Sequence, residues 1–113
     1  MINFEMTRAE SGGVQVLRLK GRLTLGEASR ALRECISDLA AEGHKYLLLD
    51  LSEVSYVDSS GLGALVAAYN SLKHQGGSVG LFQVPRRMQE LLEMSKLTAL
   101  FKIFNTEEEA VLG

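Results

Sequence analysis

The chain has 113 residues, of which 46% are hydrophobic and 23% charged, a balance typical of an ordinary globular domain. Twelve Lys and Arg residues against fourteen Asp and Glu residues give a net charge of -2, and only Arg86 and Arg87 are adjacent basic residues. We therefore expect no nucleic-acid partner, because binding nucleic-acid phosphates requires a concentrated positive surface.

Metal, redox and membrane functions are not expected either. Cys35 is the only cysteine, and His44 and His74 are far apart in the sequence, so the chain has no ligand cluster at metal spacing. The N-terminus lacks the pattern of a secretion signal, and no apolar run approaches the roughly 18 residues that a membrane span needs. We expect one domain over residues 1–113, in the cytoplasm, with no cofactor and no membrane span.

The first two predicted elements form a β-hairpin. Apolar and polar residues alternate roughly through residues 2–10 and 14–20, and Gly12 and Gly13 lie in the turn between them. This pattern predicts an antiparallel pair of strands at one side of a sheet.

A helix is predicted next, over residues 26–42, because apolar residues recur there at helical spacing and Gly43 ends the pattern. Thr24 and Glu27 have the spacing of a capping box, in which each side chain accepts a hydrogen bond from the other residue's backbone N–H. A helix cap therefore accounts for Thr24 without any contact to a partner.

The middle of the chain predicts a buried strand followed by a second helix. Residues 46–51 form a nearly continuous apolar run, extended by residues 54–57, which is typical of a central strand covered on both faces. Residues 61–74 carry one apolar stripe, and Gly76 and Gly77 end that helix.

The last third predicts a strand over residues 79–84, a helix over 86–95, a short strand over 101–104 and a final helix capped by Thr106 and Glu109. Pro85 suits the first position of the helix that follows it. The whole order is β-β-α-β-α-β-α-β-α. It predicts an α/β fold with one mixed, mostly parallel sheet of about four or five strands and about four helices.

The motif Asp58-Ser59-Ser60-Gly61-Leu62-Gly63 falls where the central strand joins the second helix. The first N–H groups of a helix have no partner within it and its dipole is positive there, so an oxygen is favoured at that point. From the residues alone, a helix cap, a nucleophile and a switch are all open for the serines. The two glycines either let a partner approach the backbone or permit a tight turn.

This motif and the order of elements, together with Gly21-Arg22-Leu23 after a strand and Gly76-Gly77 before another, resemble the STAS family, specifically bacterial anti-sigma factor antagonists. The resemblance implies a non-enzymatic protein whose unmodified form binds an anti-sigma factor and thereby releases a sigma factor. It also implies that the anti-sigma factor is a serine kinase that phosphorylates Ser59, with Ser60 as the runner-up, and that a PP2C-type phosphatase reverses this.

The resemblance places the partner-binding surface around the motif and the loop that precedes the first helix. The implied contact residues are Leu23, Thr24, Gly26, Tyr56, Asp58, Ser59, Ser60, Gly61, Leu62 and Gly63. Many members of the family carry an acidic residue after Gly-x-Leu, where this chain has Thr24. A phosphate on Ser59 is expected to meet the N–H groups of Ser60, Gly61 and Leu62, so that the switch acts locally and without refolding.

Two other functions remain as alternatives. One is a STAS scaffold or lipid-trafficking subunit that works without phosphorylation. The other is a small serine hydrolase, which the sequence disfavours because Val57 or Asp58 stands where Gly-x-Ser-x-Gly needs its first glycine. The only later histidine, His74, is also about 20 Å along the same predicted helix.

Overall fold

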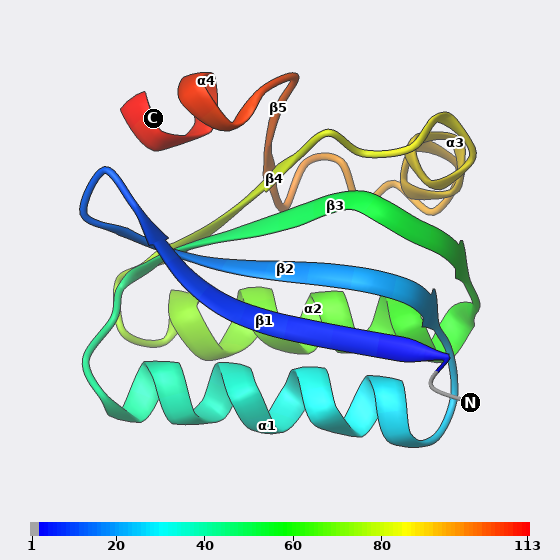
Figure 1. The fold of residues 1–113 in the computed structure, drawn as a ribbon, viewed down its shortest axis with the longest axis horizontal. Coiled ribbons are helices and arrows are strands. Elements are labelled where there is room, and N and C mark those ends of the chain that lie inside the picture. Colours follow the sequence, from blue (N-terminus) through cyan, green and yellow to red (C-terminus); the bar gives the residue numbers. More distant parts are fainter. Residues whose placement is uncertain (1–2) are drawn as a thin grey trace.

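The five strands lie in the sheet in the same order as in the sequence, β1-β2-β3-β4-β5 (Figure 1). The structure is a computed structural model that describes residues 3–113. The elements are β1 Phe4–Ser11, β2 Val14–Leu23, α1 Glu27–Ala41, β3 Tyr46–Val57, α2 Ser59–Lys73, β4 Ser78–Phe82, α3 Arg86–Met94, β5 Lys102–Phe104 and α4 Glu107–Leu112. The predicted α/β order is confirmed.

The predicted hairpin forms one edge of the sheet. β1 and β2 pair antiparallel, and Gly12 and Gly13 turn the chain with φ of 57° and 81°, values that favour glycine. Residue 2, the expected start of the first strand, lies outside the described residues. All other strand pairs are parallel, so the sheet is mixed and mostly parallel as predicted.

The central strand covers both predicted apolar runs without a break. The two apolar runs belong to one strand, β3, because β2 continues to Leu23 and pairs with β3 as far as Val57. The register shifts twice, between Arg18 and Lys20 and between Gly21 and Arg22, and each shift places one extra residue in β3. β2 and β3 therefore end side by side, at the edge of the sheet where α1 and α2 begin.

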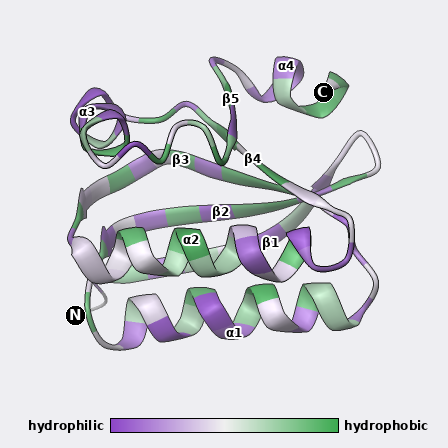
Figure 2. Ribbon diagram, turned by 180° about the vertical axis from the view of Figure 1, so that it is seen from behind, coloured by the Kyte–Doolittle hydropathy of each residue, from purple (hydrophilic) through white to green (hydrophobic). Residues whose placement is uncertain are grey.

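Helices cover both faces of the sheet. α1 and α2 run side by side along one face, and α4 lies on the other (Figures 1 and 2). The alternation along β3 decides which residues meet them: Leu47 and Leu49 join the larger core under α1 and α2, whereas Leu48 joins Phe82 and Ala110 beneath α4. α3 packs through Met88 and Leu92 into the larger core.

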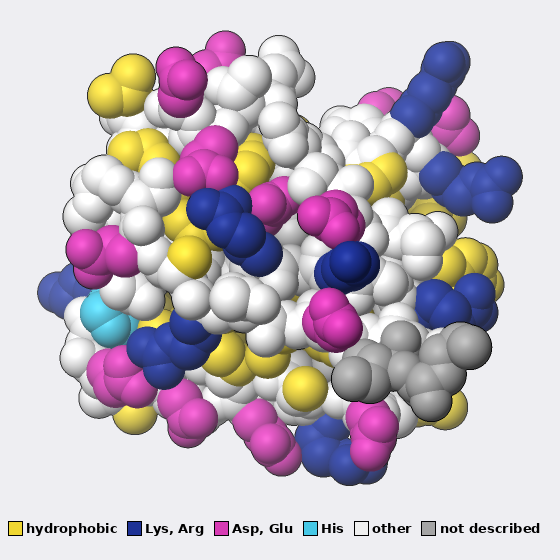
Figure 3. Space-filling view, in the orientation of Figure 1, with side chains coloured by type: hydrophobic (Ala, Val, Ile, Leu, Met, Phe, Trp, Pro, Cys, Tyr) yellow, Lys and Arg dark blue, Asp and Glu magenta, His cyan; other side chains and the backbone are white. Residues whose placement is uncertain are grey.

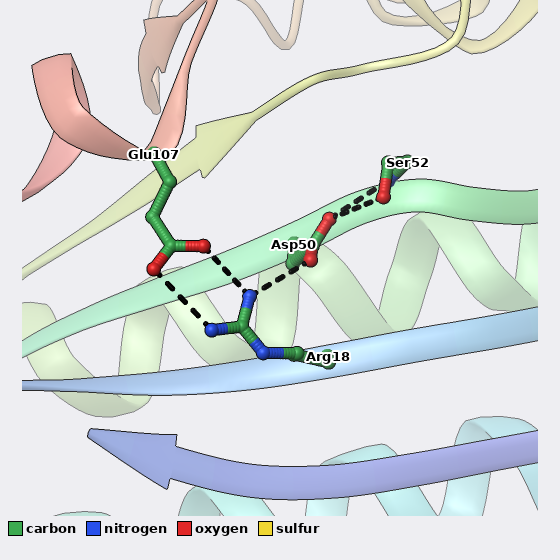
Figure 4. A network of polar contacts seen from close by, with 4 residues as sticks. All are labelled: Arg18, Asp50, Ser52 and Glu107. Atoms are coloured by element: carbon green, nitrogen blue, oxygen red, sulfur yellow. Dashed lines mark hydrogen bonds and ion pairs between the residues drawn. The ribbon is translucent and has the colours of Figure 1, made fainter. Parts of the chain in front are cut away.

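A polar network attaches α4 to the sheet (Figure 4). Arg18 of β2 donates to Asp50 of β3 at 3.0 Å and to Glu107 at the start of α4 at 2.8 Å. The hydrogen bond from Arg18 holds the pKa of Glu107 below its usual value. Acidic and basic side chains adjoin one another across this face of the molecule (Figure 3), so its charge is largely balanced locally.

We predict that Arg18→Met lowers the free energy of unfolding by about 1 kcal/mol at pH 7, because it leaves the Asp50 carboxylate, only 14% exposed, without its cation. The effect is not larger because solvent screens Arg18, which is 39% exposed. Lys20→Met is the matched control: its pair with Glu53 spans 3.7 Å and is mostly exposed, so a loss below about 0.5 kcal/mol is expected. Equal losses in urea denaturation of the two variants would contradict this assignment.

Candidate functional site

The candidate site lies where β2 and β3 end and α1 and α2 begin. We call this surface the rim and define it as residues 24–27 and 58–63, together with Arg22 and Tyr56 beside them. Parallel strands bring their carboxyl ends to one edge of a sheet, so two segments distant in the sequence meet here. The predicted motif and the predicted contact loop are thus brought together.

Asp58 joins the two halves of the rim. Its Oδ1 accepts a hydrogen bond from the N–H of Gly61 at 2.9 Å, and its Oδ2 accepts one from the N–H of Leu25 at 3.0 Å. These bonds hold the pKa of Asp58 below its ordinary value, the bond from Gly61 having the largest effect. The carboxylate is therefore ionised at neutral pH and fixes the loop before α1 against the start of α2.

Gly61 allows this close junction. A Cβ at this position would overlap the carbonyl oxygen of Leu23 and lie 2.6 Å from Cγ2 of Val57. Gly61 is buried, so the tight strand-to-helix turn explains its lack of a side chain. At Gly63 a Cβ would meet only Nη2 of Arg33, at 3.3 Å, and that flexible side chain can move.

The two serines of the motif differ in exposure. Ser59 is the first residue of α2 and is exposed, whereas Ser60 is half-buried. Among residues 3–113, neither hydroxyl is held by a side-chain hydrogen bond, because Asp58 already caps the helix. The hydroxyl of Ser59 is therefore accessible and has no part in holding the joint.

In the unmodified protein, the helix N–H groups that were expected to receive a phosphate on Ser59 already have acceptors. The N–H of Gly61 donates to the side chain of Asp58, and the N–H of Leu62 donates to the Asp58 carbonyl oxygen at 3.0 Å. The Ser60 N–H also faces the Asp58 carboxylate and helps to lower its pKa. A phosphate on Ser59 would therefore have to compete with Asp58 for these donors.

The predicted capping box of Thr24 and Glu27 is wrong. Gly26 is the N-cap residue of α1, with φ of 102°, and no side chain caps the helix. The carbonyl oxygen of Thr24 instead accepts hydrogen bonds from the Ser29 hydroxyl at 2.7 Å and from the Ser29 N–H at 3.2 Å. The positive φ of Gly26 turns the chain before Glu27 can reach back. At the other end of the chain, the predicted Thr106 cap is confirmed by its bond from Glu109 N–H.

Leu25 lies in the predicted contact loop but was not among the predicted contact residues. Its side chain is 78% exposed, and its backbone is fixed by Asp58. Tyr56, which was predicted, is 43% exposed and lies under the Arg22 guanidinium, 4.6 Å from the ring centroid. The sequence does contain a signal for Leu25, because it is an apolar residue in a loop that follows Gly21 and precedes Gly26.

The other predicted contact residues lie deeper. Leu23 and Gly61 are buried and support the rim from below, so their side chains present no surface to a partner. Six are half-buried: Thr24, Gly26, Asp58, Ser60, Leu62 and Gly63.

The histidines lie at the far ends of the helices that begin at the rim. His44 follows α1 and contacts Glu42 at 3.5 Å, and His74 follows α2. Each helix has 15 residues, so a histidine at its far end is about 22 Å from the rim. Neither histidine is near enough to take a proton from Ser59, as a serine hydrolase would require.

The part of the chain that the structure describes holds no group of three or more His, Cys, Asp or Glu side chains arranged to bind a metal. In the same part, no helix has the length and apolarity to cross a membrane.

Comparison with known proteins identifies related chains along nearly the whole sequence. The family model described as the STAS domain matches residues 5–110. The anti-sigma-F factor antagonist RsfB of Mycobacterium tuberculosis is 33% identical over 110 residues, which cover 96% of this chain and 87% of that protein. The anti-sigma-B factor antagonist of Listeria monocytogenes is 41% identical over 63 residues, 56% of this chain, and the chain spans only about half, 55%, of its length.

Solved structures support the same fold. The phosphorylated form of the Bacillus protein SpoIIAA matches with a TM-score of 0.73 at 26% identity, covering 96% of both chains. The unphosphorylated form matches with a TM-score of 0.74 at 21% identity, covering 96% of this chain and 94% of the other.

We predict that Gly61→Ala destabilises the protein by about 1–3 kcal/mol, because the new methyl group must displace the end of β2 or Val57. Gly63→Ala is the matched variant two residues further along α2. It should leave stability unchanged or raise it by up to about 1 kcal/mol, since alanine favours the helix. Chemical denaturation of both variants tests this, and a Gly61→Ala protein as stable as the unmodified chain would refute the tight-junction account.

We predict that Asp58→Ala lowers the thermal midpoint at pH 7, whereas Asp38→Ala, an exposed site on α1, leaves it nearly unchanged. Because folding lowers the pKa of Asp58, its contribution is present above the unfolded value of about 3.9 and is lost as pH falls through the folded value. The difference in thermal midpoint between the unmodified protein and Asp58→Ala should therefore become smaller below about pH 4. Thermal denaturation at pH 7 and pH 3 measures this. An equal difference in midpoint at both pH values would contradict a stabilising role for the ionised Asp58 carboxylate.

Proposed function

The chain belongs to the STAS-domain family, and from this premise we propose that it is an anti-sigma factor antagonist that phosphorylation of Ser59 switches off. In the proposal the unmodified protein binds an anti-sigma factor with serine-kinase activity and so releases a sigma factor. A PP2C-type phosphatase restores the unmodified form. The protein acts by binding in the cytoplasm and not by catalysis.

The single observation that carries the proposal is the position of Ser59. It is exposed, it begins a helix at the rim, and it lies in the same surface region as the exposed Leu25 and Tyr56. Exposed apolar and aromatic side chains around an accessible hydroxyl are what a protein interface with a modification site needs. The names of the related antagonists in Mycobacterium and Listeria support the same type of partner.

Phosphorylation would act at this surface through charge. It adds about -1.5 to -2 charges to a neutral side chain, directly after the ionised Asp58. The N–H groups of Gly61 and Leu62 already donate to Asp58 in the unmodified protein, so they are not free donors for the phosphate. A partner seated on the rim would have to desolvate that charge, and ~4 kcal/mol already weakens binding about a thousandfold.

The switch needs no refolding. The joint between the two halves of the rim depends on Asp58, and the Ser59 hydroxyl makes no side-chain hydrogen bond among the described residues. The phosphate therefore changes what can dock on the rim and leaves the frame beneath it in place. Ser60 remains the runner-up acceptor, and its partial burial makes it less accessible to a kinase.

Affinity measurements test the proposal with the full chain and a candidate anti-sigma kinase. We predict that Ser59→Glu weakens binding by about a hundredfold or more, whereas Ser59→Ala binds as the unmodified protein does. Ser37→Glu, an exposed serine on α1 outside the rim, is the charge control and should alter the affinity less than about threefold. Equal affinity of Ser59→Glu and unmodified protein would favour the phosphorylation-independent scaffold.

Intact-mass analysis after incubation with ATP and the kinase should give one phosphate on Ser59.

A further inference from the structure

Arg33 of α1 extends across to the first turns of α2. Its Nη2 lies 3.3 Å from the position that a Cβ of Gly63 would take, so the missing side chain at Gly63 leaves room for the guanidinium. α1 and α2 lie side by side on the same face of the sheet (Figures 1 and 2). Arg33 thus places a positive charge against the surface of α2 near the rim.

Gly63 and Ser59 are four residues apart in α2 and therefore lie on one face of the helix, one turn from each other. A Cα–Cβ bond in a helix tilts toward the helix N-terminus. A guanidinium near the Cβ position of Gly63 consequently lies over the turn that Ser59 begins. Side chains at such positions are about 5–6 Å apart at Cβ, within reach of a long cation and a phosphorylated serine.

Arg33 is available for this contact. It is exposed, and none of the ion pairs within residues 3–113 includes it. The nearby Asp58 carboxylate is held by the N–H groups of Gly61 and Leu25.

We propose that the guanidinium of Arg33 is the intramolecular partner of the phosphate on Ser59, reached across the gap that Gly63 leaves. This inference rests on the proposed phosphorylation of Ser59. A planar guanidinium suits a phosphate because it donates two parallel hydrogen bonds to its oxygens. The pair offsets the repulsion between the phosphate and the neighbouring Asp58 carboxylate, whose own hydrogen bonds come from Gly61 and Leu25.

The experiment uses full-length protein with phosphoserine inserted at position 59 during translation, so that no kinase is required. Phosphorus-31 NMR then measures the second pKa of the phosphate in this protein and in Arg33→Gln. A cation stabilises the dianion and lowers that pKa, so removing Arg33 should raise it by about half a pH unit, the size expected of an exposed pair. Arg30→Gln, an exposed arginine one turn earlier on α1, should shift it by less than about 0.2 of a unit.

Identical titrations of the unmodified-sequence phosphoprotein and Arg33→Gln would overturn the proposal. An equal shift of the phosphate pKa in Arg30→Gln would also overturn it, since that would indicate a general effect of positive charge instead of a direct ion pair with Arg33. Thermal denaturation of Arg33→Gln verifies the fold of this exposed variant. Failure of the proposed function gives a different result: the phosphoprotein would bind the anti-sigma factor with undiminished affinity, whatever its phosphate titration shows.

Discussion

The carboxylate of Asp58 holds the rim together. One oxygen accepts from Gly61 in the first turn of α2, and the other accepts from Leu25 in the loop before α1. A single side chain therefore satisfies donors from two segments that are far apart in the sequence. Because the bonded form is the charged one, the same contacts keep the carboxylate ionised and keep the joint closed at neutral pH.

In this arrangement, one residue stabilises the rim and a different residue carries the proposed modification site. In many helices the residue that caps the first turn is the serine itself, and modifying that serine would disturb the helix. Here Asp58 is the cap and Ser59 is left free on the surface. The separation explains how a charge can be added and removed at one hydroxyl while the fold beneath it stays the same.

The sequence predicted those features that depend on neighbours in the chain. Gly12 and Gly13 marked the hairpin, the leucines before Asp50 marked the central strand, and Thr106 marked the cap of α4. The features it missed depend on distant contacts. Leu25 is presented by a bond to a residue 33 positions away, and Arg18 reaches Glu107 across 89 positions. No periodicity or local spacing carries that information.

Local patterns also failed where the backbone had a special conformation. Thr24 and Glu27 have the spacing of a capping box, but the positive φ of Gly26 between them prevents it. The helix start at Ser59 instead of residue 61 has a similar origin, since Asp58 rather than Ser59 or Ser60 is the cap. The sequence placed the motif correctly at the joint between the central strand and α2, whereas the hydrogen bonds of its individual residues required the structure.

The most direct test of the account is amide hydrogen exchange, measured by NMR, at Leu25 and Gly61 in protein carrying phosphoserine at position 59. Their N–H groups bond to Asp58 in the unmodified protein. If phosphorylation acts only on what can dock at the rim, both amides will keep the protection that they have without the phosphate. Loss of protection at either amide would mean that the phosphate displaces Asp58, and it would contradict a switch that leaves the fold unchanged.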